Sequence, residues 1–373
     1  MDKNKRGKPQ FSGEKSGTTL KDSCVLIMGQ SPSSNSYNTS GDGLPFYQGN
    51  ADFGEENPIP RSWCTEPKKI AEKGDILISV RAPIGAINIA DEKCCIGRGV
   101  AAIRPNQEVM SPDFLQHQLF ASRNKLEAMG TGSTFKAIGK KTLSDFPVVI
   151  YPKNTKEAIA QQLNSIKKQI KTANSQLDQL DALVKSRFIE MFGDPNDQRP
   201  STFIEDGFSI RDDLRKPLSG AERSGMHDGE LYPYYGANGV VDYINSYLTD
   251  FDALCFAEDC GSYGARESST YVIEGRGWVN NHAHLLKPKE DCLLRYADTY
   301  FYLSDLNRLI SGTTRAKLTQ AQLKQIRFEI PSLDLRRRFT AFYCQVDKLR
   351  FKTQQQIEKL EMLKESLMQE YFG

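Results

Sequence analysis

The sequence has no long apolar run. No stretch of its 373 residues approaches eighteen consecutive apolar residues, the length expected of a membrane-spanning helix. The first seventeen residues, MDKNKRGKPQFSGEKSG, also lack the apolar core of a secretory signal peptide. We therefore expect a cytoplasmic protein. The length allows two ordinary domains or slightly more.

Cysteine pairs and a strong charge imbalance are also missing. The eight cysteines include no C-x-x-C pair, and a chain of this size needs no disulfide framework, so we expect reduced thiols. The formal net charge is only +2. Composition alone therefore does not indicate a nucleic-acid binder, and the distribution of charge along the chain has to decide.

Catalytic motifs are absent as well. GDPN at 193–196 is not the Asn/Asp-Pro-Pro-aromatic motif of an amino methyltransferase, and GRG at 97–99 is too short for a cofactor loop. GSTFKAIGKKT at 132–142 has the wrong spacing for a phosphate loop, with Lys141 where Ser or Thr should follow Lys140. The sequence also has no Pro-Asp that is followed later by an acid-x-Lys motif, the order expected in a metal-dependent nuclease. We expect no catalysis by this chain alone.

Two histidines lie two positions apart in the second half of the sequence. His282 and His284 alternate along an expected strand, so their rings would face the same side and could bind a metal. Such a pair is more often packed or directed at DNA. We therefore predict no metal and no cofactor bound by this chain.

The sequence contains an internal repeat. A shift of 180 residues aligns QLDQLDALVKSRFIEMFG (176–193) with QIEKLEMLKESLMQEYFG (356–373), and seven of these eighteen positions are identical. The same shift aligns GSTFKAIGKKTLSDFPVVI (132–150) with GTTRAKLTQAQLKQIRFEI (312–330). A repeat of this length is two copies of a domain-plus-helix unit rather than a solenoid.

Each copy has the same expected organisation. About 140 residues with short apolar runs and many Gly, Pro and Asn indicate a mixed α/β domain, and a proline (Pro152, Pro331) then precedes a long helix. We predict an α/β fold class, with mixed α+β recognition domains, two long helices in an antiparallel coiled coil and a pseudo-two-fold repeat. The predicted segments are a first domain at 1–152 with a basic leader at 1–20, a helix at 153–193, a second domain at 194–331 and a helix at 332–373.

Apolar residues follow a heptad pattern in both helices. We expect the two apolar stripes to pack against each other along about 54 Å. Arg350 and Thr353 interrupt the second stripe. The first stripe is Ile159, Leu163, Ile166, Ile170, Ala173, Leu177, Leu180 and Val184, and the second is Phe339, Phe342, Val346, Leu349, Ile357, Leu360, Leu363 and Leu367.

Basic residues cluster at matching positions of the repeat. The first cluster contains a single acidic residue, Glu127, among the basic residues Arg123, Lys125, Lys136, Lys140 and Lys141. The second cluster contains no acidic residue, and its basic residues are Arg315, Lys317, Lys324 and Arg327. Both clusters lie at small-residue turns, whose backbone N–H groups suit phosphate oxygens. Loop Asn, Gln and Arg side chains can pair with base edges. The predicted DNA-binding residues are Gln48, Asn50, Arg81, Arg98, Lys136, Lys140, Lys141, Tyr235, Asn238, Arg266, Asn280, Asn281, Arg315 and Lys317.

Several stretches spread along the chain are specific when taken together. Six of them are MGQSPSSNSYN (28–38), GLPFYQGNADFG (43–54), GDILISVRAPIG (74–85), CCIGRGVAAIRP (94–105), YPYYGANGVVDY (232–243) and GWVNNHAHLL (277–286), and a further one is LDALVKSRFIEMFGDP (180–195). With these stretches, essentially the whole chain resembles the specificity subunits of type I restriction-modification systems, and residues 180–195 are similar to the central helical region of that family. A basic leader of about twenty residues and the interruption at Arg350 and Thr353 depart from the family pattern.

The resemblance implies a function and partners. It implies two target-recognition domains that each read one half of a split, asymmetric duplex site, with the helices setting the spacing. It also implies methyltransferase subunits that modify adenine with S-adenosylmethionine, and restriction subunits that use ATP and Mg. If each of the similar endings RFIEMFG (187–193) and LMQEYFG (367–373) docks a partner, two methyltransferase subunits would bind. The stripe residues, including Leu349 and Leu363, would serve the coiled coil or partner docking. Two alternatives stay open: a protein-binding scaffold without DNA recognition, which the low net charge favours slightly, and a self-sufficient nuclease.

Overall fold

The computed structural model describes residues 15–132, 136–259, 262–310 and 316–373. The chain divides into two compact units: residues 1–173 with 356–373, and residues 174–355. Each long helix therefore contributes its two ends to different units. Among the described helices, none is long and apolar enough to cross a membrane. Arg315 lies outside the described residues.

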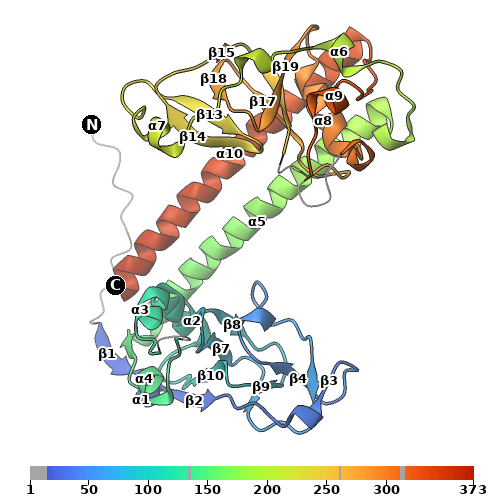
Figure 1. Cartoon of the computed structure of the whole chain (residues 1–373). Helices are drawn as coiled ribbons and strands as arrows, with labels where there is room; N and C mark the ends of the chain where they lie inside the picture. The colour runs from blue at the N-terminus through green and yellow to red at the C-terminus, as the bar shows by residue number, and fades with distance from the viewer. Residues whose placement is uncertain (1–14, 133–135, 260–261, 311–315) are drawn as a thin grey trace, which may run out of the picture. The chain divides into compact units, whose positions relative to one another are not determined.

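The first unit contains two larger sheets and a small one (Figure 1). β4 and β9 pair in parallel, and the other paired strands described in this unit run antiparallel. The four-stranded sheet has the order β2 (Cys24–Met28), β10 (Val100–Pro105), β7 (Ile76–Ser79), β8 (Ile87–Ile89). The five-stranded sheet has the order β3 (Tyr37–Asn38), β5 (Trp63–Cys64), β4 (Leu44–Tyr47), β9 (Cys94–Ile96), β6 (Ile70–Ala71), and β1 (Ser16–Thr19) pairs with β11 (Pro147–Ile150).

Apolar strands and a capped helix form the core of the first unit. All four residues of β7 are buried, as expected for a central strand that is covered on both faces. α2 (Pro112–Ala121) begins with Pro112, and the Ser111 hydroxyl accepts a hydrogen bond from the N–H of Phe114 at 3.3 Å, a standard N-terminal cap. The remaining short helices are α1 (Leu20–Ser23), α3 (Arg123–Ala128) and α4 (Lys140–Ser144).

The second unit contains two four-stranded sheets, most of whose strands are labelled in Figure 1. β13 and β18 pair in parallel, like β4 and β9 of the first unit. One sheet has the order β12 (Phe208–Ile210), β19 (Ala283–Pro288), β16 (Ala253–Ala257), β17 (Thr270–Ile273), and the other has the order β14 (Gly239–Ile244), β13 (Tyr232–Gly236), β18 (Arg276–Val279), β15 (Thr249–Asp250). The short helices are α6 (Ile204–Gly207), α7 (Gly220–Ser224), α8 (Leu294–Leu303) and α9 (Gln320–Leu323).

The helices α5 (Lys153–Phe192) and α10 (Leu333–Phe372) take part in both cores. In the first unit, Ile159, Leu163 and Ile166 of α5 are in one buried cluster with Leu367 and Tyr371 of α10. In the second unit, Val184 and Phe188 of α5 cluster with Phe339 and Val346 of α10, and the rings of Phe188 and Phe339 meet edge to face with centroids 5.4 Å apart. Within each unit, the start of one helix thus packs against the end of the other.

The predicted apolar stripe of α10 needs a correction at two residues. Leu349 and Leu363 are 51% and 46% exposed, whereas the residues that follow them, Arg350 and Lys364, are partly buried. Arg350 pairs with Asp181 of α5 at 2.5 Å, and the Lys364 ammonium lies 4.8 Å from the ring centroid of Phe120. Polar residues with partners of their own therefore occupy the inward positions, and the two leucines face outward.

The first turn of each long helix carries a buried cation. Lys156 is 5% exposed and its ammonium donates to the carbonyl oxygen of Val109. Arg336 is 3% exposed and donates from Nη1 to the carbonyl of Asp291 at 2.9 Å and from Nη2 to Glu290. Burial lowers the pKa of Lys156. Both cations fasten a long helix to the segment that precedes α2 or α8.

Candidate nucleic-acid interface

The two parallel strands of the first unit end side by side. β4 leads into Gln48 and Asn50, and β9 leads into the turn that contains Arg98. The N–H of Gly97 donates to the carbonyl of Tyr47 at 2.8 Å, which joins the two loops. The pairing in parallel thus brings together predicted residues that lie about fifty positions apart in the sequence.

Two further segments extend this row. The N–H of Val80 donates to the carbonyl of Gly99 at 2.9 Å, and the N–H of Ile138 donates to the carbonyl of Val80 at 2.9 Å. Arg81 forms an isolated bridge with Ala137. We call residues 47–50, 80–82, 97–99 and 136–138 the first edge.

Glycine is required where these loops touch. A Cβ atom on Gly99 would lie 2.2 Å from the carbonyl oxygen of Gln48, and one on Gly97 would lie 3.2 Å from the Gln48 Cα. A side chain does not fit at Gly99, and at Gly97 it would fit only if its neighbours moved by a few tenths of an ångström, so the close approach of the turn Gly97–Arg98–Gly99 depends most on Gly99. The turn is held close to the loop after β4 and directs Arg98 outward, where it is exposed.

Most predicted residues of the first unit are exposed. Gln48, Arg81, Arg98 and Lys136 are exposed on the first edge, and Asn50 is partly buried there. Lys140 and Lys141 are also exposed but begin α4, just beyond the edge. The side chains of Arg81, Arg98 and Lys136 place three positive charges on the first edge.

The second unit builds the same row from the equivalent strands. The N–H of Asn280 donates to the carbonyl of Tyr235 at 3.1 Å, where β13 and β18 end. The N–H of Glu258 donates to the carbonyl of His282 at 2.8 Å, and the N–H of Leu318 donates to the carbonyl of Glu258 at 2.7 Å. Asp259 bridges to Lys317, as Arg81 does to Ala137. We call residues 235–238, 258–259, 280–282 and 316–318 the second edge.

The second edge corrects two predictions from the sequence. Tyr235 is 8% exposed and its ring stacks on Tyr271, with centroids 5.9 Å apart, so it belongs to the core. Asn280 is also 8% exposed, and its Oδ1 accepts the N–H of His282 at 2.8 Å. Both residues support the edge, whereas Asn238 and Asn281 are exposed on it. Arg266 is exposed with a φ of 67°, and its N–H donates to Tyr302, so it lies in the segment between β16 and β17 rather than on the edge.

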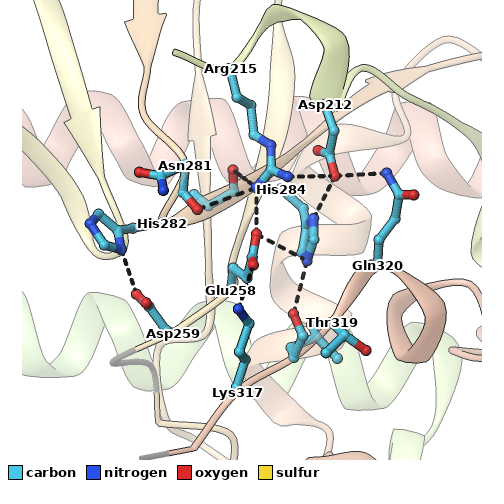
Figure 2. Close-up of polar contacts among 12 residues, drawn as sticks. Asp212, Arg215, Glu258, Asp259, Asn281, His282, His284, Lys317, Thr319 and Gln320 are labelled. Atoms are coloured by element: carbon cyan, nitrogen blue, oxygen red, sulfur yellow. Dashed lines mark hydrogen bonds and ion pairs between the residues drawn. The ribbon is translucent and has the colours of Figure 1, made fainter. Parts of the chain in front are cut away.

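A network of charged side chains joins the second edge to neighbouring segments (Figure 2). Arg215, with 15% of its side chain exposed, pairs with Asp212 at 3.0 Å and with Glu258 at 2.6 Å. Lys317 pairs with Glu258 at 3.1 Å, and Gln320 donates to Asp212 at 2.9 Å. The network joins the turn after β12, the end of β16 and the segment before α9.

His284 lies within this network and is buried. The side chain is 1% exposed, and its Nδ1 lies 2.7 Å from Asp212 Oδ2 while its Nε2 lies 2.9 Å from the carbonyl oxygen of Leu318. The ring therefore links Asp212 to the segment that contains Leu318.

The network lowers the pKa of both carboxyl groups. Burial acts to raise the pKa of Asp212, but the hydrogen bond and charge of His284, the N–H of Leu285 and the charge of Arg215 together hold it below its usual value. Burial likewise opposes the shift of Glu258, whose pKa is lowered by Arg215, Lys317 and His284. Both groups are therefore ionised at neutral pH.

The two histidines bind different carboxylates. His282 Nδ1 lies 2.8 Å from Asp259 Oδ1, whereas His284 faces Asp212. Within the described part of the chain, no group of three or more His, Cys, Asp and Glu side chains could hold a metal ion. Seven cysteines are free thiols, and Cys260 lies outside the described residues.

Comparison with known proteins identifies the family. The model of the type I restriction modification DNA specificity domain matches residues 16–182 and 223–362, which is more than half of the chain. The chain belongs to this family. A solved type I restriction-modification S subunit from M. genitalium has a similar fold over 98% of both chains, with a TM-score of 0.66 and 16% identity.

Curated members of the family are similar over part of their length. The putative type I restriction enzyme MjaX specificity subunit of Methanocaldococcus jannaschii is 42% identical over 160 residues, which are 43% of this chain and 38% of that protein. The putative specificity subunit S.HindORF215P of Haemophilus influenzae is 34% identical over 134 residues, 35% of this chain and 33% of that protein. The matched stretches thus span about a third of the length of each relative.

No pattern in the sequence predicted that Asp212, Arg215 and Glu258 belong to the site. They lie in DDLR and AEDC, which have no periodic pattern and no motif. The signal that was available is His284, a polar residue inside the apolar run AHLL, since a buried histidine requires partners. The sequence does not reveal which residues those partners are, because they come from other strands of the fold.

Proposed function

We propose that the chain is the DNA sequence-specificity subunit of a type I restriction-modification complex. In this proposal the first edge reads one half of a split, asymmetric duplex site and the second edge reads the other half. The observation that carries it is that one row of four loops is built twice, with different exposed side chains on each copy. Membership in the specificity family supports the same conclusion.

We infer that α5 and α10 form one antiparallel coiled coil that relates the two copies by a pseudo-two-fold repeat. Both helices begin and end 180 residues apart, at 153 and 333 and at 192 and 372. The strand order β2-β10-β7-β8 has its counterpart in β12-β19-β16-β17. On this proposal the recognition domains are 1–152 and 194–331, and the helices at 153–193 and 332–373 set the gap between the half-sites.

We further propose that the helices dock two methyltransferase subunits, which in turn allow restriction subunits to join. Exposed apolar side chains on both helices support a protein partner: Leu183, Leu349, Phe351, Met362 and Leu363. S-adenosylmethionine, ATP and Mg would then be bound by the partners in the cytoplasm, and this chain would bind no cofactor and perform no catalysis itself.

A map of methylated adenines in the source genome, with and without this gene, tests the proposal. Loss of methylation at one split, asymmetric motif is the expected result. An unchanged map, together with no binding of duplex DNA by the purified complex at low salt, would instead favour the protein-binding scaffold. Cutting of plasmid by the purified chain with Mg²⁺ would contradict the absence of catalysis.

A further inference from the structure

We propose that Arg98 and Asn281 are the equivalent base-reading residues of the two edges, Arg98 for a guanine in one half-site and Asn281 for an adenine in the other. This inference rests on the proposed function and adds to it which side chains set the sequence and which bases they favour.

The two residues occupy the same position in the two edges. Arg98 follows Gly97, whose N–H donates to Tyr47, and precedes Gly99, whose carbonyl accepts from Val80. Asn281 follows Asn280, whose N–H donates to Tyr235, and precedes His282, whose carbonyl accepts from Glu258. Each is thus the middle residue of a turn that leads from a parallel strand into the central strand β10 or β19.

Both side chains are available for a ligand. Arg98 and Asn281 are exposed, and over the described ranges neither side chain forms a hydrogen bond or ion pair with the protein. Their neighbours on the second edge are already engaged: Asn280 binds the N–H of His282, and His282 binds Asp259. Figure 2 shows Asn281 beside His282, whose ring binds Asp259.

The turns hold these side chains in place. The glycines of the first turn bring its backbone against Gln48. Under the second turn, Arg215 Nη1 lies 3.5 Å from the carbonyl of Asn281 and 3.2 Å from that of Ala283. A backbone that is fixed before binding loses less entropy when its side chain pairs with a base.

The chemistry of the two side chains predicts different bases. The guanidinium fork of arginine donates two hydrogen bonds to O6 and N7 of guanine, and the amide of asparagine pairs with N6 and N7 of adenine. Each such pair discriminates against the wrong base by about 5- to 150-fold. Because the two turns carry different residues, the two half-sites should differ at the contacted position.

The test uses the intact complex, isolated on the tagged full chain, and a pool of duplexes with random sequence in both halves. Bound duplexes are sequenced for the wild type, R98Q and N281D. R98Q should move one guanine preference of one half-site towards adenine, since glutamine pairs with adenine. N281D should move one adenine preference of the other half towards cytosine, since a carboxylate accepts from cytosine N4. R337Q and N174D, exposed changes on α10 and α5, are the matched controls and should leave every preference unchanged.

The outcomes separate the two proposals. If the wild-type complex selects no split motif, the proposed function fails. If it selects one and R98Q lowers affinity equally for all sequences, Arg98 contacts phosphate and this inference is overturned. Unchanged preferences in both variants, or both variants altering the same half-site, would overturn it as well. Recovery of the complex and an unchanged thermal midpoint establish that each variant is folded.

Discussion

Asp212 shows how much the second unit depends on one buried carboxylate. It accepts hydrogen bonds from His284, Gln320 and the N–H of Leu285, and it pairs with Arg215. Replacing it with asparagine removes one of the two carboxylates that pair with the mostly buried Arg215, and breaking a buried ion pair typically costs about 3 kcal/mol or more. We expect D212N to lower the free energy of unfolding of the second unit by about 3 kcal/mol, measured by urea unfolding.

The neighbouring residue provides the control. Asp213 pairs with Arg211 at 2.8 Å, but 60% of its side chain is exposed. Water screens such a pair, so D213N should leave the urea midpoint unchanged. Equal destabilisation by both changes would show that the network around Asp212 adds no more stability than a surface ion pair.

The same carboxylates predict how stability depends on pH. Asp212 and Glu258 have ordinary pKa values of 3.8 and 4.5, and both pKa values are lowered in the folded chain. Their stabilisation is therefore complete above the ordinary values and is lost as the pH falls through the folded values. Between pH 7 and pH 3 we expect the unfolding free energy of the wild type to fall more steeply than that of the double variant D212N/E258Q. Parallel curves would contradict this role.

At the scale of the element, the register of α10 is the clearest prediction. Val346 is 3% exposed and packs against α5 in the second unit, whereas Leu349 is 51% exposed. Removing two buried methyl groups costs about 2 kcal/mol, so V346A should destabilise the chain by about that amount. L349A should change stability by no more than about 0.5 kcal/mol. Urea unfolding of the two variants checks the register, and a larger effect of L349A would restore the stripe read from the sequence.

The two helices also show what a sequence can predict. The stripe of α5 from Ile159 to Val184 is free of exposed residues, because apolar residues occupy its inward positions without interruption. In α10 the inward positions include Arg350 and Lys364, whose partners Asp181 and Phe120 lie far away in the sequence. A pattern based on hydrophobicity passes over such positions and selects the nearest leucine. The sequence could not predict the two edges for a similar reason. The parallel pairing of β4 with β9 brings together loops that no local sequence pattern connects.

The last residues of the chain belong to a core. Leu367, Met368, Tyr371 and Phe372 are buried with Phe114 in the first unit, and the hydroxyl of Tyr151 donates to the carbonyl of Tyr371 at 2.9 Å. The similar ending RFIEMFG at 187–193 places Phe188 in the core of the second unit. The repeated sequence thus serves the same purpose in each unit. A deletion of residues 360–373 would disrupt the first unit itself, so partner docking is better tested on the exposed Met362 and Leu363.

For the whole molecule, the distribution of charge matters more than the net charge of +2. Lys140 and Lys141 are exposed at the start of α4, next to the first edge. If both contact phosphates in the proposed complex, K140A/K141A should reduce the slope of log affinity against log salt by about 1.8, because each contact contributes about 0.9. The selected sequence should stay the same, since phosphate contacts carry no base information. The double change K348A/K352A on the exposed face of α10 is the control, and an equal loss of slope there would show that the effect comes from overall charge and not from the first edge.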